Sequence, residues 1–231
     1  VTPLTISTYK HLKRSFDFTS VCTDLYYFTG VYNYYREAYP REYPVYKSLA
    51  LLFPHGDMET GLKELKTAAV NSVVLRAESY SMLGDIYLTF ENKLPESSYY
   101  CRILYEKYPG NVLYLSTYIR NLLLMKKYDE AEILIAASTD EEGNNFFQAQ
   151  LIILKGILQE KRYLDNKLAQ QYYYKGINDI SIFGRYGNEY AAYAYFGLSR
   201  ISEGNGEKHT RKIYRKEALK LADFKKIHFD K

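Results

Sequence analysis

The stretch from residue 77 to residue 111 carries the pattern of two antiparallel helices joined by a short turn. Its first part places Tyr80, Leu83, Gly84 and Tyr87 at helical spacing. A second helix is predicted over residues 96–107, and it must end before Pro109, because proline has no amide hydrogen and clashes with the preceding turn. In a chain built from such units, each helix pair buries its apolar face only against its neighbours. The sequence therefore predicts an all-α fold of antiparallel helix pairs.

The pattern recurs along the chain with a period of about 34 residues. The predicted units are residues 24–71 with an insertion at 40–57, then 77–111, 112–145, 149–180 and 190–226. We expect one helical-repeat domain over residues 1–231, with about ten helices and no sheet. Small residues that would let two helices approach closely are predicted at Gly30, Gly84, Gly156 and Gly197.

The insertion at residues 40–57 departs from the repeat. Pro40, Pro44 and Pro54 bracket an apolar segment over residues 45–53, which we expect to form an extra short helix. Asp57 is predicted to cap the following helix, residues 58–71, because its carboxylate can accept hydrogen bonds from free amides of the first turn.

The helix predicted over residues 24–39 carries two aromatic stripes. One consists of Tyr27, Val31 and Tyr34, and the other of Phe28, Tyr32, Tyr35 and Tyr39. A single packing partner needs only one stripe. The second is either covered by residues 45–53 or faces the groove of the helical array, and coverage is favoured because large exposed apolar patches are uncommon on monomers.

These features resemble the tetratricopeptide repeat (TPR) family from roughly residue 20 to the end, most closely at 77–111 and clearly at 112–138. The Gly-x-Tyr-x-Tyr-Tyr motif at residues 30–35 and Phe-Pro-His-Gly-Asp at 53–57 are similar to an envelope-associated bacterial branch without assigned chemistry. The resemblance implies a TPR-like α-solenoid, a right-handed superhelix that binds a protein or peptide on its concave face. It implies no cofactor and no catalysis.

The same resemblance implies which side chains line the groove. The inward positions of the family correspond here to Tyr27, Tyr34, Tyr35, Asp85, Leu88, Arg120, Leu124, Leu158 and Arg162. The family's clamp for a peptide carboxylate needs Lys and Asn at inward positions, but two successive units hold Asp85 and Arg120 there. A receptor for chaperone tails is therefore not expected.

The resemblance also implies a location in the bacterial cell envelope, in the periplasm or as a lipoprotein. The chain opens Val1-Thr2-Pro3, without Met and without a charged and then apolar leader. We therefore expect its beginning to be a processed or cut end, with the targeting signal outside this chain. No apolar run approaches the ~18 residues of a membrane-spanning helix.

Two other functional classes are an RNA-binding repeat protein and an enzyme. An RNA-binding repeat protein would use the tyrosines, 27 in number, and a basic C-terminal helix. Its basic residues are Lys208, Arg211, Lys212, Arg215, Lys216, Lys220, Lys225 and Lys226. The net charge of +4 is too small to favour nucleic acid without a concentrated patch, and a solenoid's last helix also needs a polar outer face.

For an enzyme, no nucleophile, acid–base pair or metal set emerges. The four histidines, His11, His55, His209 and His228, are scattered without the spacing of a zinc site. Cys22 and Cys101 are expected to be buried as small hydrophobic residues. A protein-binding scaffold is the leading hypothesis.

Overall fold

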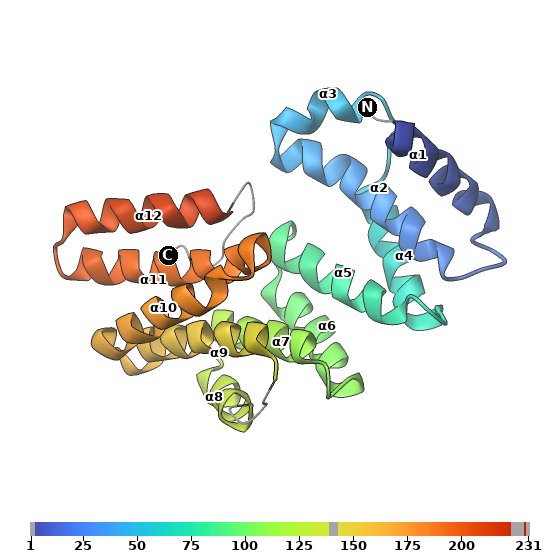
Figure 1. Cartoon of the computed structure of the whole chain (residues 1–231). Coiled ribbons are helices and arrows are strands. Elements are labelled where there is room, and N and C mark those ends of the chain that lie inside the picture. Colours follow the sequence, from blue (N-terminus) through green and yellow to red (C-terminus); the bar gives the residue numbers. More distant parts are fainter. Residues whose placement is uncertain (1–2, 139–142, 223–228, 230–231) are drawn as a thin grey trace. The chain divides into compact units, whose positions relative to one another are not determined.

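A computed structural model describes residues 3–138, 143–222 and 229, and all regular structure within these ranges is helical (Figure 1). The described residues form twelve α-helices, several short 3-10 turns and one π-turn, without a strand. The helices pack in neighbouring pairs, which confirms the all-α prediction and is consistent with an α-solenoid. None of these helices is both long and apolar enough to cross a membrane. The chain divides into two compact units, Val1–Lys107 and Tyr108–Lys231.

The N-terminal unit contains six α-helices. They are α1 (Pro3–Ser15), α2 (Leu25–Glu42), α3 (Lys47–Ala50), α4 (Met58–Asn71), α5 (Arg76–Thr89) and α6 (Leu94–Lys107). Helix α2 packs on α4, α4 on α5 and α5 on α6. Helix α1 was not predicted, because it lies before the first repeat unit. The unit's core consists of side chains from α2, α4 and α5, with Tyr34, Leu65, Leu83 and Ile86 fully buried.

The insertion contains the short helix that was predicted, α3, preceded by a 3-10 turn at Pro44–Tyr46. The prediction that the preceding helix ends at residue 39 was wrong, since α2 continues through Pro40 to Glu42. It ends there because Tyr43 has an extended backbone, as favoured for a residue before proline. Asp57 caps α4 as predicted, accepting a 2.6 Å hydrogen bond from the Thr60 amide. Residues 43–57 are called the inserted segment below.

Helices α2 and α4 cross with their backbones in contact. A Cβ atom on Gly61 would lie 2.6 Å from the Tyr34 nitrogen and 2.8 Å from the Gly30 oxygen. A Cβ on Gly30 would in turn lie 2.9 Å from the Gly61 oxygen. Close approach at Gly30 is therefore confirmed, and Gly61 forms the other half of the contact. Gly84 is less tightly placed, because its added Cβ would lie 3.2 Å from the Cys101 sulfur and 3.9 Å from the next nearest atoms.

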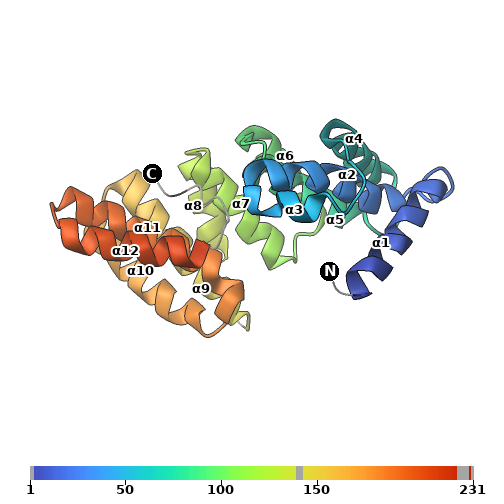
Figure 2. The same ribbon diagram turned by 90° about the horizontal axis from the view of Figure 1, so that it is seen from above.

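The C-terminal unit contains the remaining six α-helices. They are α7 (Val112–Leu124), α8 (Tyr128–Ala137), α9 (Asn145–Leu158), α10 (Asn166–Ser181), α11 (Asn188–Gly204) and α12 (Lys208–Ala222). Helix α9 packs on α10 and α11 on α12. Figure 1 shows α11 and α12 side by side, and the two helices overlap in the view of Figure 2. The predicted units 112–145, 149–180 and 190–226 correspond to the helix pairs α7–α8, α9–α10 and α11–α12, although α9 begins at Asn145, before the second of these units. Residues 223–226 of the last unit lie outside the described residues.

Gly156 and Gly197 have a different role from the one predicted. A Cβ on Gly156 would lie 2.8 Å from the ring of Tyr173, and one on Gly197 only 2.3 Å from it. Tyr173 is fully buried on α10, between α9 and α11. The two glycines therefore make room for an aromatic ring rather than for a neighbouring backbone.

Candidate ligand-binding site

A cavity of about 1020 Å³ lies in the N-terminal unit between α1, α2 and the inserted segment. We call it the aromatic cavity. Its walls are mainly apolar: α1 contributes Tyr9, His11, Leu12 and Ser15; α2 contributes Leu25, Phe28, Val31, Tyr32, Tyr35, Arg36, Tyr39 and Pro40; and the inserted segment contributes Tyr46, Leu49, Ala50 and Phe53. A cavity of this size, lined by aromatic side chains, is typical of a binding site for an apolar group.

The second aromatic stripe of α2 forms one wall of the aromatic cavity. All four of its members, Phe28, Tyr32, Tyr35 and Tyr39, belong to the lining. The inserted segment lies on the other side of the cavity and covers this stripe only in part, since Phe28 and Tyr39 remain 45% and 41% exposed. The first stripe belongs to the core instead, because Tyr34 is fully buried and both Tyr27 and Val31 pack against it. Val31 also reaches the cavity lining.

The rings around the aromatic cavity contact one another. The ring centroids of Tyr9 and Phe53 lie 5.2 Å apart, those of Tyr35 and Tyr39 lie 5.1 Å apart, and those of Tyr39 and Tyr46 lie 5.7 Å apart. Such tilted and edge-to-face pairs add attraction beyond the apolar area that they bury. Ring contacts therefore connect the three walls of the cavity.

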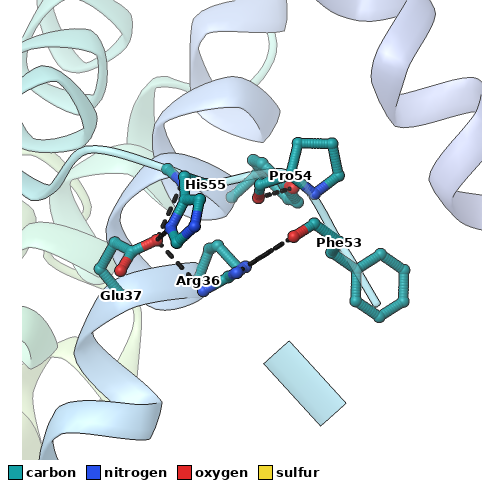
Figure 3. A network of polar contacts seen from close by, with 7 residues as sticks. Arg36, Glu37, Phe53, Pro54 and His55 are labelled. Atoms are coloured by element: carbon teal, nitrogen blue, oxygen red, sulfur yellow. Dashed lines mark hydrogen bonds and ion pairs between the residues drawn. The ribbon is translucent and has the colours of Figure 1, made fainter. Parts of the chain in front are cut away.

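Hydrogen bonds from α2 fix the inserted segment beside the cavity (Figure 3). The Tyr32 hydroxyl donates to the Pro54 carbonyl at 2.6 Å, and the Arg36 guanidinium donates twice to the Phe53 carbonyl, at 3.0 and 3.2 Å. The Glu37 carboxylate accepts from the Gly56 amide at 3.0 Å and from Arg36 at 3.1 Å. We call these contacts the loop anchor.

His55 adds a weaker contact to the loop anchor. Its Nδ1 atom lies 3.4 Å from the Glu37 carboxylate oxygen, while its side chain is 85% exposed (Figure 3). The turn predicted around His55 and Asp57 is thus explained by the capping of α4 and by the Glu37 contact. The loop anchor holds the wall that carries Phe53 in place.

Three polar side chains of the cavity wall, Tyr32, Tyr35 and Arg36, already have partners within the protein. Burial, with a contribution from Tyr9, raises the pKa of Tyr32 to about 12. Burial also raises the pKa of Tyr35, and the charge of Asp85 adds to the rise. Both hydroxyls therefore stay protonated near neutral pH, where they can donate hydrogen bonds but cannot act as bases. Since the Arg36 guanidinium is occupied by the loop anchor, the wall is suited to binding apolar groups.

The groove residues predicted in the N-terminal unit lie in different environments. Tyr35 lines the aromatic cavity, and its hydroxyl lies 3.3 Å from the Met82 sulfur. Tyr34 is buried and donates a 2.6 Å hydrogen bond to Glu91. Tyr27 is half-buried against the core, Leu88 is buried and Asp85 is exposed.

In the C-terminal unit, the two predicted groove arginines form ion pairs within the unit. Arg120 is buried and lies 2.8 Å from Glu189. Arg162 pairs with Asp129 at 2.6 Å and with Glu132 at 2.7 Å. Leu158 of α9 is buried and Leu124 of α7 is half-buried.

A buried polar cluster in the C-terminal unit was missed by the sequence analysis. Glu160, in the π-turn Gln159–Tyr163, accepts a 2.6 Å hydrogen bond from the Tyr173 hydroxyl. Arg200 donates to the same carboxylate at 2.6 and 2.8 Å. Burial would raise the pKa of Glu160, but the hydrogen bonds and charge of Arg200 outweigh it and lower that pKa. The cluster joins α10 and α11 to the end of α9, which is a structural role.

In the described part of the chain, no three His, Cys, Asp or Glu side chains are grouped so that they could hold a metal ion. Cys101 is buried as predicted, but the same prediction for Cys22 was wrong. Cys22 is exposed because it lies in the turn before α2 rather than on a packed helix face.

Helix α12 has a buried face of small residues and a basic outer face. Ala218 and Ala222 are buried, while Lys212, Lys216 and Lys220 are exposed. Lys225 and Lys226 lie outside the described residues. Arg211 pairs with Glu203 of α11 at 3.3 Å, so part of the basic set is balanced within the unit.

Comparison of the chain with protein-family models, with curated proteins and with solved structures gave no match. The resemblance to the TPR family therefore rests on the repeat pattern, most clearly on residues 77–138. Among the features of the structure, the aromatic cavity is the strongest candidate for a binding site.

Proposed function

We propose that this protein is a non-enzymatic scaffold whose N-terminal unit binds an apolar segment of a protein or peptide partner in the aromatic cavity. The observation that carries the proposal is the cavity itself, about 1020 Å³ with a mainly aromatic and aliphatic lining. Phe28, Tyr39 and Leu49 are each more than 40% exposed there. A bound partner would remove these side chains from water, and buried aromatic anchors typically dominate the free energy of an interface.

We also propose that the helix pairs belong to a TPR-like solenoid with a right-handed superhelix. The repeat period and the packing of helices in neighbouring pairs support this assignment. Two of the three walls of the aromatic cavity, α1 and the inserted segment, lie outside the repeat pattern. Its ligand would therefore be particular to this chain rather than common to helical repeats.

The site can be tested by selecting peptides from a random display library on the full chain. The affinity of a selected synthetic peptide would then be measured by calorimetry for the wild type and for Leu49→Glu. This substitution places a charge in the cavity wall at a side chain that is 45% exposed, so the fold should tolerate it. We expect Leu49→Glu to weaken binding by about 30-fold or more, corresponding to an anchor worth ~2 kcal/mol.

Val73→Glu is the matched control, because Val73 is an exposed apolar residue of the same unit, 86% accessible, outside the cavity lining. It should leave the affinity unchanged. Equal affinities for the wild type and Leu49→Glu, or the recovery of no binding peptide at all, would contradict the proposal.

A further inference from the structure

We propose that the occupant of the aromatic cavity is an acidic amphipathic α-helix of the partner. This inference rests on the proposed function and specifies the conformation, length and charge of the ligand. Three independent features of the cavity carry it: the state of the backbone in its walls, the length of the aromatic stripe, and the charges on the elements that border it.

The cavity walls offer no backbone edge to an extended peptide. Helices α1 and α2 use their amides and carbonyls within their own turns, and the Phe53 and Pro54 carbonyls are occupied by the loop anchor. The amides of residues 51–53 also donate within the inserted segment. An extended ligand would therefore bury its own amides and carbonyls without partners, which is unfavourable for each such group. A helix satisfies these groups internally, so docking of a helix in a groove is the compatible mode.

The aromatic stripe of α2 sets the length of the ligand. From Phe28 to Tyr39 the stripe covers about three helical turns, or roughly 16 Å at 1.5 Å per residue. Phe28 and Tyr39, at its two ends, are its most exposed members, while Tyr32 and Tyr35 between them are half-buried. A partner helix of similar length would match it with three or four apolar side chains, spaced as i, i+3 or i+4, and i+7.

The exposed charges on the bordering elements are mostly basic. Lys10, Lys13 and Arg14 lie on α1, Arg41 lies near the end of α2, and Lys47 lies on α3, against the acidic residues Asp17, Glu42 and Asp57. Arg36 and Glu37 pair with each other and do not change this balance. A partner helix whose solvent-facing side is acidic would complement these charges, which favours both encounter and correct orientation.

Three labelled peptides, each about 14 residues long and thus able to cover the stripe, test the proposal by fluorescence anisotropy on the full chain. The first is an amphipathic helix with Leu and Phe on one face and Glu on the other. The second replaces Glu with Lys, and the third has the composition of the first with its apolar residues spread around the helix. We expect the first to bind at least tenfold more tightly than the second, and the third not to bind.

Two variants connect the binding to the cavity. Leu49→Glu should abolish binding of the first peptide, and Lys47→Glu should weaken it several-fold, more strongly at low salt because exposed charges are screened by ions. Circular dichroism of each variant checks that the helix content is retained. Equal binding of the Glu and Lys peptides would overturn the acidic assignment.

The experiment separates failure of this inference from failure of the proposed function. If library-selected peptides bind at the site sensitive to Leu49→Glu but carry no acidic amphipathic pattern, the proposed function stands and this inference falls. If no peptide binds but phosphatidylglycerol vesicles do, in a manner lost in Leu49→Glu, the occupant is an acyl chain and both proposals fall.

Discussion

Single residues decide how closely the helices of this protein can pack, and Gly61 provides the sharpest test. Its missing Cβ would lie 2.6 Å from a backbone nitrogen of α2, which cannot move without separating the two helices. Gly61→Ala should therefore destabilise the protein by about 1–3 kcal/mol, the usual cost of overpacking. Urea denaturation monitored by circular dichroism would measure this loss.

Gly84→Ala is the matched control, in a helix of the same unit. Its added methyl would meet a flexible sulfur at 3.2 Å, and alanine favours a helix over glycine by about 1 kcal/mol. We expect this variant to be as stable as the wild type or more stable. If the two substitutions cost the same, the α2–α4 crossing is not as tight as the distances indicate.

At the scale of elements, Asp24 connects the start of α2 to the start of α5. Its carboxylate accepts hydrogen bonds from the amides of Val73, Val74 and Leu75, at 3.1, 2.8 and 2.7 Å. The Leu75 bond is the main reason that the pKa of Asp24 lies below its ordinary value. A carboxyl group with a lowered folded-state pKa stabilises the fold above its unfolded-state pKa, and this contribution is lost as the pH falls through the folded-state value.

Asp24→Ala should therefore lower the Tm near pH 7, and the difference from the wild type should shrink as the pH falls below the ordinary range of Asp. Asp57→Ala is a suitable comparison, since the Asp57 cap on α4 accepts a hydrogen bond from a single backbone amide. Its loss should lower the Tm by less than the loss of Asp24. Thermal melts of the three proteins at neutral and acidic pH measure both effects. A difference between Asp24→Ala and the wild type that is constant with pH would show that the charge of Asp24 does not contribute.

At the scale of the whole molecule, the two compact units can be tested for independent stability. The buried cluster around Tyr34 and Leu65 consists only of residues of the N-terminal unit. Leu65→Ala should create a cavity that costs about 2–5 kcal/mol. We expect hydrogen exchange measured by mass spectrometry to accelerate in α2, α4 and α5 and to stay unchanged in α9–α11.

Ile153→Ala, at a fully buried position of α9, is the reciprocal variant and should accelerate exchange in the C-terminal unit alone. If either variant accelerates exchange equally throughout the chain, residues 1–231 unfold as one cooperative domain, as the sequence predicts.

The sequence by itself determined the helical class, most helix positions and the cap at Asp57. These features depend on interactions within a few residues: apolar periodicity, the loss of an amide at proline, and a carboxylate next to free amides. It also singled out Phe28, Tyr32, Tyr35 and Tyr39 as a stripe that needed its own explanation, because spacing along a helix gives the face on which each side chain lies.

Only the tertiary structure decided which residues each helix face contacts. Tyr34 and Tyr35 are neighbours in sequence, yet one is fully buried and the other lines the aromatic cavity. Gly156 and Gly197 accommodate the ring of Tyr173, a contact that no spacing along the chain predicts. The cavity itself depends on α1, which precedes the repeat, and on the inserted segment, which interrupts it. Local periodicity orients side chains around their own helix, whereas the partner of each face is chosen by contacts between residues distant in sequence.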